Sequence, residues 1–266
     1  MQTIALISRK GGTGKSTLAI GLAIAAMEAG EKVCLLEADP LGTISNWHRR
    51  RSRAEPTVEW VRDGCALTQC ASLLERRGVT LTIIDTAGGW SDASTAAIGA
   101  ADLCLIPARP SPADIEAAAP ALRAIRAAGK PFAFVLNQTP ARSYRLNDAA
   151  VSLGDTATSL NLAGVLALPY VVQRNDQQDA LGAGLAVTEF ARAGKSAAEV
   201  GALWQWVAAR LATLSETRAE LPATPPAEVA GIAVPADQAE SIAADSEVDF
   251  DAAVPANVQD ELRAAG

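Results

Sequence analysis

Eight consecutive residues near the N-terminus have the composition of a phosphate-binding loop. Glycines let backbone N–H groups approach an anion closely, and a lysine followed by hydroxyl side chains can bind phosphate and Mg²⁺. The loop follows an apolar segment and precedes an alanine-rich one, which is the strand-to-helix context that such a loop requires. Its residues are Lys10, Gly11, Gly12, Thr13, Gly14, Lys15, Ser16 and Thr17.

The types of side chain assign a task to each part of this loop. Backbone amides from Gly11 to Lys15 form a concave anion site for the α- and β-phosphates of ATP, and Lys15 places a point charge at the β- and γ-phosphates. The Ser16 hydroxyl is placed to bind Mg²⁺, a cation that prefers oxygen ligands. Thr17 supports the nucleotide one residue further along. We therefore expect ATP and Mg²⁺ as cofactors.

The loop departs from the usual pattern G-x-x-x-x-G-K-[ST] at its start. The first glycine of that pattern would fall at residue 9, where this chain has Arg9, followed by Lys10 and Gly11. From this position the Lys10 side chain does not easily reach the γ-phosphate of its own nucleotide. It could reach a nucleotide that a second copy of the chain binds.

Short apolar segments alternate with helix-like ones through the first 214 residues, and these elements must position the loop. The alternation is typical of βαβ units, and near-continuous apolar strands are typical of a parallel sheet covered on both faces. We predict an α/β fold with a doubly wound, mostly parallel sheet flanked by helices. Strands are expected over residues 3–8, 32–37, 80–85, 103–107, 131–137 and 164–168, and helices over 16–29, 113–128 and 197–214.

Two acidic motifs follow the loop in the order expected of a nucleotide site. They are Leu35-Leu36-Glu37-Ala38-Asp39-Pro40 and Ile83-Ile84-Asp85-Thr86-Ala87-Gly88. Together with the loop they resemble the deviant Walker A ATPases of the ParA/MinD group, over roughly residues 1–214. Within that group the chain is most similar to small ParA-type partition ATPases.

The resemblance implies a role for several residues. Lys10 matches the signature lysine, which reaches across an ATP-bound dimer, so catalysis is assigned to Lys10, Lys15 and Asp39. Asp39 would help to hold the water shell of the metal and orient the attacking water. Asp85 matches the Walker B aspartate, so the metal is assigned to Ser16, Asp39 and Asp85.

Two further residues are placed in the nucleotide site, and two depart from the family pattern. The Gly88 amide could sense the γ-phosphate, and Asn137 is counted among the nucleotide-binding residues. The family often has D-x-D-P-Q where this chain has Glu37 and Leu41 at the first and last positions. The role of the first carboxylate and the coupling to a partner are therefore open.

The resemblance also implies partners and a cellular task. We expect an ATP-dependent homodimer that binds DNA non-specifically and drives plasmid or chromosome partition, with slow hydrolysis stimulated by a ParB-like centromere-binding or cargo-adaptor protein. The expected location is cytoplasmic and nucleoid-associated. An electrostatic DNA surface requires basic residues. The candidates are Arg142, Arg145, Arg174, Arg192 and Lys195, with the run 48–53 in addition.

The charge of the chain is unevenly distributed. Its formal net charge is −7, yet residues 215–266 contain eleven acidic residues against two basic ones, Arg218 and Arg263. Residues 1–214 therefore carry a net positive charge, which is compatible with a nucleic-acid partner. Scattered prolines among Ala, Glu, Asp and Ser predict that residues 215–266 form a disordered acidic tail, distinct from an ATPase domain over 1–214.

Other classes of protein share this loop. A MinD-like membrane ATPase would need a basic C-terminal amphipathic helix, and a membrane span would need about 18 to 20 apolar residues; the sequence offers neither, so no membrane partner is expected. A P-loop reductase would need cluster cysteines, whereas Cys34, Cys65, Cys70 and Cys104 form no C-x-x-C pair and are expected to be reduced core thiols. A metabolic kinase would show ordinary small-molecule turnover. A positioning ATPase for a protein cargo fits the same motifs as partition does.

Overall fold

The computed structural model describes residues 1–141 and 165–220, and these ranges form six strands and eight helices. The chain divides into two units, Met1–Leu221 and Pro222–Gly266, and the described residues all belong to the first. The strands are β1 (Gln2–Leu6), β2 (Val33–Ala38), β3 (Thr57–Trp60), β4 (Leu81–Thr86), β5 (Leu103–Ala108) and β6 (Phe132–Leu136). The helices are α1 (Lys15–Glu28), α2 (Thr43–Arg50), α3 (Gly64–Arg76), α4 (Asp92–Ala100), α5 (Pro112–Ala127), α8 (Asn175–Gly182), α9 (Val187–Phe190) and α10 (Lys195–Glu220).

The six strands form one parallel sheet in the order β3-β2-β4-β1-β5-β6. The predicted fold class is confirmed. Parallel strands end at the same edge of a sheet, where ligands of open α/β folds bind. The register places Asp85 on β4 beside both Leu6 on β1 and Glu37 on β2. The phosphate loop and both acidic motifs therefore meet at one edge.

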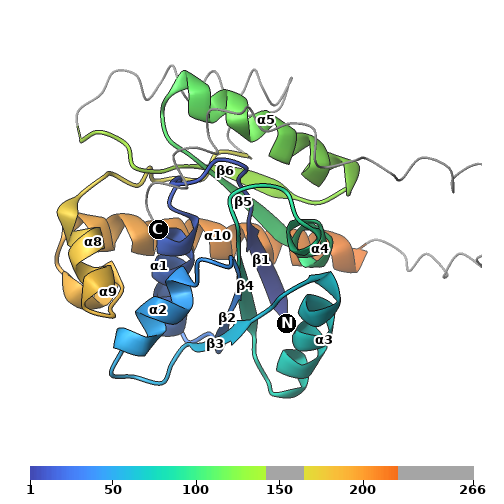
Figure 1. The fold of residues 1–266 in the computed structure, drawn as a ribbon, viewed down its shortest axis with the longest axis horizontal. Helices are drawn as coiled ribbons and strands as arrows, with labels where there is room; N and C mark the ends of the chain where they lie inside the picture. Colours follow the sequence, from blue (N-terminus) through green and yellow to red (C-terminus); the bar gives the residue numbers. More distant parts are fainter. Residues whose placement is uncertain (142–164, 221–266) are drawn as a thin grey trace, which may run out of the picture. The chain divides into compact units, whose positions relative to one another are not determined.

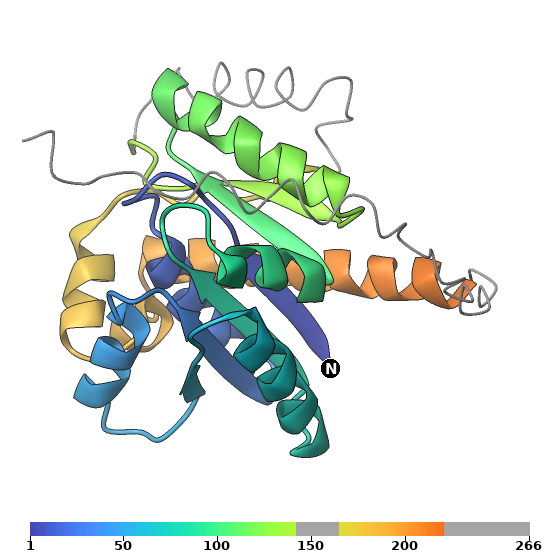
Figure 2. The same ribbon diagram turned by 45° about the vertical axis from the view of Figure 1, so that its right-hand side comes forward.

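Two helical layers cover the sheet. Alternate strand residues such as Leu6 and Leu35 face a core that includes α1, α2 and α10, whereas Ala5 and Leu36 face a core built with α3, α4 and α5. Figure 1 shows α10 crossing behind the strands, and in Figure 2 helices α3, α4 and α5 lie on the other side of the sheet. Small residues allow α1 to approach α10 closely, since a Cβ added at Gly21 would lie 3.1 Å from Val200.

Three expectations about the elements need correction. Over residues 164–168, where a strand was predicted, the described residues contribute a single bridge from Leu166 to Phe134, and Pro169 follows without an N–H to extend a ladder. The last helix runs from Lys195 to Glu220, past the predicted domain boundary at residue 214. Strand β3 and helices α2, α3, α4, α8 and α9 were not predicted. Most of them are short and bury few apolar residues, so they lack the apolar runs from which the other elements were predicted.

The four cysteines are all free. Cys34 and Cys104 are buried in β2 and β5, and burial raises the pKa of each thiol to about 12. Cys65 is exposed on α3 and Cys70 on the same helix is partly exposed. The prediction of four core thiols is therefore wrong for these two, which lie on the outer helical layer.

Candidate functional site

The phosphate loop is held in place from the end of β6. The side-chain amide of Asn137 donates to the Thr13 carbonyl at 2.8 Å, and Gln138 Nε2 donates to the Gly12 carbonyl at 3.0 Å. Gly14 has a φ of +87°, and a Cβ there would collide with the Asn137 amide. Only glycine combines this conformation with this contact. Asn137 therefore supports the loop directly, and Gln138, which sequence reasoning missed, does the same.

The buried end of the loop consists of Lys15 and Ser16 with the facing Asp85, and its two ionisable side chains are buried. Lys15 begins α1 and is buried, which lowers its pKa, while the charges of Asp85 and Asp39 oppose that shift. Burial raises the pKa of Asp85 to about 7, although Ser16 and Lys15 act in the opposite direction. Among the described residues neither carboxylate oxygen of Asp85 has a hydrogen bond of ordinary geometry; the Ser16 hydroxyl is near enough to lower its pKa without completing one.

This unpartnered carboxylate fits the site of a divalent cation. Buried polar atoms are nearly always hydrogen-bonded, so an orphaned carboxylate beside a phosphate loop is explained by a ligand that completes it. Ser16 and Asp85 supply the oxygen atoms that Mg²⁺ prefers. Within residues 1–141 and 165–220 there is no group of three or more His, Cys, Asp or Glu side chains that could hold a metal. Phosphate oxygens and water would have to fill the other positions.

The two acidic residues after β2 have different tasks. Glu37 is fully buried and accepts from the Ile44 and Ser45 backbone N–H groups at 2.7 and 3.0 Å, so it caps the start of α2. The role of this first carboxylate, which the sequence left open, is therefore structural in the described chain. Asp39 is buried in the turn, where its Oδ1 accepts from the Leu41 N–H at 3.0 Å, and its charge still reaches Lys15 and Asp85.

The open end of the loop consists of Lys10 and Gly11 with Asp114 and Arg109. Lys10 Nζ lies 2.8 Å from Asp114 Oδ2, and Arg109 Nε lies 3.2 Å from Asp114 Oδ1. Asp114 lies in the first turn of α5, whose N-cap is Ser111. Gly88 approaches the same end, because a Cβ there would lie 3.3 Å from Gly11 N. Lys10 therefore ends on a carboxylate of its own chain, outside the phosphate loop.

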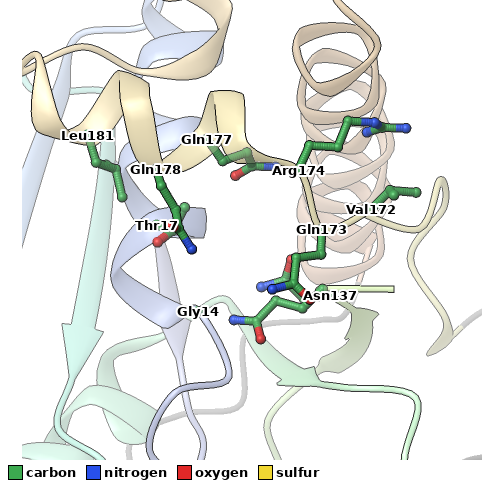
Figure 3. Close-up of a pocket in the computed structure, with 10 residues that line it drawn as sticks. Gly14, Thr17, Asn137, Val172, Gln173, Arg174, Gln177, Gln178 and Leu181 are labelled. Atoms are coloured by element: carbon green, nitrogen blue, oxygen red, sulfur yellow. The ribbon is translucent and has the colours of Figure 1, made fainter. Parts of the chain in front are cut away.

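A cleft beside the loop has the lining expected for the base and sugar of a nucleotide. It lies between the loop, the end of β6 and α8, and side-chain amides predominate in its wall. In Figure 3 Asn137 and Gln173 lie on one side, and Thr17, Gln178 and Leu181 on the other. Its lining residues are Gly14, Thr17, Asn137, Gln138, Val172, Gln173, Arg174, Gln177, Gln178 and Leu181.

The N-terminal half of the chain is similar to known proteins. A protein-family model described as VirC1 protein matches residues 1–128. The maintenance of carboxysome distribution protein A of Gloeobacter kilaueensis is 36% identical over 121 residues, which cover 43% of this chain and 52% of that protein. Protein virC1 of Rhizobium radiobacter is 32% identical over 123 residues, 44% of this chain and 53% of that protein. The chain spans about half the length of the curated relatives it matches.

Solved structures share the fold at low identity. MinD of Aquifex aeolicus superposes with a TM-score of 0.63 at 16% identity, covering 79% of this chain and 98% of that one. Apo McdA of Cyanothece gives 0.61 at 18%, with 79% and 99% covered, and a ParA family ATPase of Chlorobium tepidum gives 0.58 at 15%, with 77% and 98% covered. The chain therefore has the fold of these ParA/MinD-type structures, and the similarity of its N-terminal half to VirC1 and to a carboxysome distribution protein supports the resemblance drawn from its sequence motifs.

The basic residues expected to bind DNA in a ParA/MinD-type protein are not equivalent. Arg174 pairs with Glu199 through two contacts of 2.7 Å, and this hydrogen bonding raises its pKa. It therefore ties α8 to α10, a structural task that sequence alone does not reveal. Arg192 lies just before α10 and Lys195 begins it, and both are exposed, while Arg142 and Arg145 lie outside the described residues.

The basic run at 48–53 is largely structural. Arg51 is buried on Glu189 through contacts of 2.6 and 2.7 Å, with side-chain exposures of 1% and 6%. Arg50 donates to the Leu181 carbonyl and Arg53 contacts Glu189. These contacts join α2 to α8 and α9, so Arg51 is not available to DNA. Arg49 and Arg53 are exposed, and their part in a DNA surface stays a prediction. None of the helices in the described ranges has the length and apolar character to cross a membrane.

Proposed function

We propose that the chain is a Mg²⁺-dependent ATPase that dimerises on ATP and uses hydrolysis to release the dimer, in order to partition or position a cargo. One observation carries the proposal: the two lysines of a single phosphate loop are placed differently. Lys15 is buried beside Asp85, whereas Lys10 is about one-third exposed and ends on Asp114. The first serves a nucleotide in the same chain, and the second is available to leave.

The residues of the site support phosphoryl transfer by positioning and electrostatics. Lys15 and the loop amides bind the phosphates, Asn137 and Gln138 keep the loop rigid, and Asp39 orients the attacking water. Ser16, Asp85 and Asp39 would hold Mg²⁺, which would supply positive charge to the terminal phosphates. The chain needs no covalent intermediate.

Dimerisation would add the charge that one chain does not direct to its own phosphates. Lys10 would exchange Asp114 for the phosphates of a second copy. The exchange is energetically feasible, because Arg109 stays on Asp114 when Lys10 leaves, so the buried carboxylate keeps a partner. Hydrolysis should therefore depend on the dimer, and loss of the γ-phosphate should release it.

The surface on which the cargo moves is proposed as non-specific DNA, and the proposed location is the cytoplasm, on the nucleoid. Exposed Arg192 and Lys195 are the described candidates that support a DNA contact. A ParB-like partner would stimulate hydrolysis in plasmid or chromosome partition. A protein cargo is the second candidate, favoured by the 36% identity to a carboxysome distribution protein; the partner would then be a cargo adaptor.

The test is ATP hydrolysis by the full chain, with and without Mg²⁺, DNA and a copurified partner. We expect slow basal turnover that requires Mg²⁺ and rises when DNA and the partner are both present. Lys15→Ala should abolish it, whereas the exposed Lys32→Ala serves as a matched control. Fast turnover that DNA and partner leave unchanged would contradict the proposal and point to a metabolic enzyme.

A further inference from the structure

Arg109 places a guanidinium beside the phosphate loop. It is the first residue after β5, and β5 lies next to β1, the strand that leads into the loop. Arg109 Nη2 lies 3.4 Å from the Gly11 carbonyl oxygen, and a Cβ added at Gly12 would lie 3.4 Å from the same nitrogen. The group therefore rests against the Gly11–Gly12 segment.

One carboxylate fixes this guanidinium. Arg109 Nε lies 3.2 Å from Asp114 Oδ1, while Nη2, on the same edge of the guanidinium, lies 3.4 Å from the Gly11 carbonyl oxygen. The contact with Asp114 uses Nε alone, so the terminal nitrogens keep donors for a phosphate. The Asp114 side chain is 4% exposed, against 37% for Arg109. Burial alone would raise the pKa of Asp114, but hydrogen bonds from Lys10 and Ser111 and the charge of Arg109 outweigh it and lower the pKa. Asp114 thus remains ionised and neutralises only one of its two cations.

The charge of the bound nucleotide would exceed that of Lys15, so a further cation such as Arg109 could be neutralised there. ATP with Mg²⁺ carries a net charge of about −2, since metal ions neutralise part of the phosphate charge. Lys15 supplies one positive charge from the same chain, and the proposed function sends Lys10 to a second copy. A guanidinium presents several donors in a rigid fork that suits phosphate oxygens.

We propose that Arg109 binds the terminal phosphate of the nucleotide held by its own chain, and that Asp114 is its positioning residue. The inference rests on the proposed function, because it requires ATP in the loop. Arg109 also keeps Asp114 paired when Lys10 departs, which avoids a buried carboxylate without a partner. An arginine supplied from the same chain is a known means of stabilising charge in phosphoryl transfer.

Equilibrium binding of AMPPNP and of ADP tests the proposal, measured with Mg²⁺ at protein concentrations where sedimentation shows monomer. This condition removes any contribution of a second copy's Lys10. Arg109→Gln should weaken AMPPNP binding about tenfold or more, as expected when a charged hydrogen bond is removed, and ADP binding by less than about threefold. Arg109→Lys should lie between wild type and Arg109→Gln. Arg123→Gln, at an exposed position on α5, is the control and should match wild type.

The outcomes separate this proposal from the one on which it rests. If wild type binds AMPPNP and Arg109→Gln weakens both nucleotides equally, or neither, Arg109 only ties α5 to the loop and the inference is overturned. If wild type binds neither nucleotide, the proposed function itself fails. Thermal melting of each nucleotide-free variant shows whether a change in affinity follows from a change in stability.

Discussion

The two ends of the phosphate loop differ in how their charges are partnered. At the buried end, Lys15 and Asp85 are enclosed, and both oxygens of Asp85 lack hydrogen bonds of ordinary geometry to the part of the chain that the structure describes. At the open end, Lys10 and Arg109 are partly exposed, and both are paired with Asp114. Lys15 and Asp85, which would bind ligands of their own chain, are thus fixed by burial, whereas Lys10, which would move to a second copy, is held by an ion pair that it can exchange. Variants at each end test this difference.

Removal of Lys15 should have the largest effect. Lys15→Ala deletes the buried charge that meets two phosphates, so the affinity for ATP should fall by about a hundredfold. Isothermal titration with ATP and Mg²⁺ measures this, and Lys32→Ala should bind like wild type. A Lys15→Ala protein with nearly normal affinity would show that the buried end does not bind the phosphates.

Asp85→Asn should separate stability from metal dependence. The pKa of about 7 in the folded protein exceeds the value of about 3.9 for an unfolded aspartate, so the folded state binds more protons between these values. Wild-type stability should fall as pH rises from about 4 to 7, by about 1.4 kcal/mol for each pH unit, and stay level above. Urea unfolding of the nucleotide-free protein should therefore find Asp85→Asn more stable than wild type at pH 8.

The same variant should lose the benefit of Mg²⁺ for nucleotide binding. Wild-type affinity for Mg²⁺-ATP should rise as pH increases through about 7, because only the ionised carboxylate favours the cation. If Asp85→Asn is less stable at pH 8 and keeps its Mg²⁺ dependence, the carboxylate is a satisfied structural group, contrary to the description of this end.

Asp114→Asn tests the open end. Removal of the carboxylate charge frees Lys10 from its ion pair in the same chain, so at saturating AMPPNP the dimer should form at about three- to tenfold lower protein concentration. Saturating AMPPNP removes any loss of nucleotide affinity that follows when Arg109 loses its positioning carboxylate. Sedimentation against protein concentration measures the midpoint, and Glu116→Gln, a neighbouring position exposed on α5, should not change it. A higher protein requirement for Asp114→Asn would mean that Asp114 promotes the dimer.

The smallest effect is expected at the proposed DNA surface. Replacing Arg192 and Lys195 together by Gln should weaken ATP-dependent DNA binding and reduce the slope of log affinity against log salt by about 0.9 for each phosphate that the variant no longer neutralises. Arg174→Gln would instead break the pair with Glu199, and its effect should show in thermal stability. An unchanged salt slope in the double variant would move the surface elsewhere.

Most of the fold and of the buried end could be predicted from sequence, for a physical reason. Lys15 and Ser16 follow from the spacing of the phosphate loop, and Asp85 from the resemblance to the ParA/MinD group; parallel strands bring both motifs to one edge of the sheet. The open end could not be predicted in this way, because Asp114 and Arg109 reach Lys10 only through the pairing of β1 with β5, about a hundred residues along the chain.

The cleft beside the loop and the basic residues also contain some features that the sequence predicts and some that it does not. Asn137 could be placed from its position after a strand, whereas Gln138 and Gln173 have no motif and are joined only by the end of β6 and the start of α8. The use of Arg51 and Arg174 as buried or paired cations depends on Glu189 and Glu199, which no local pattern links to them.

The central claim about the loop is that Lys10 leaves Asp114 for the nucleotide of a second copy. The most direct measurement is sedimentation of wild type and Lys10→Gln with AMPPNP and Mg²⁺, together with their rates of ATP hydrolysis. Wild type should shift from monomer to dimer, whereas Lys10→Gln should bind the nucleotide, remain monomeric and lose nearly all turnover. A Lys10→Gln protein that dimerises and hydrolyses ATP like wild type would contradict the account.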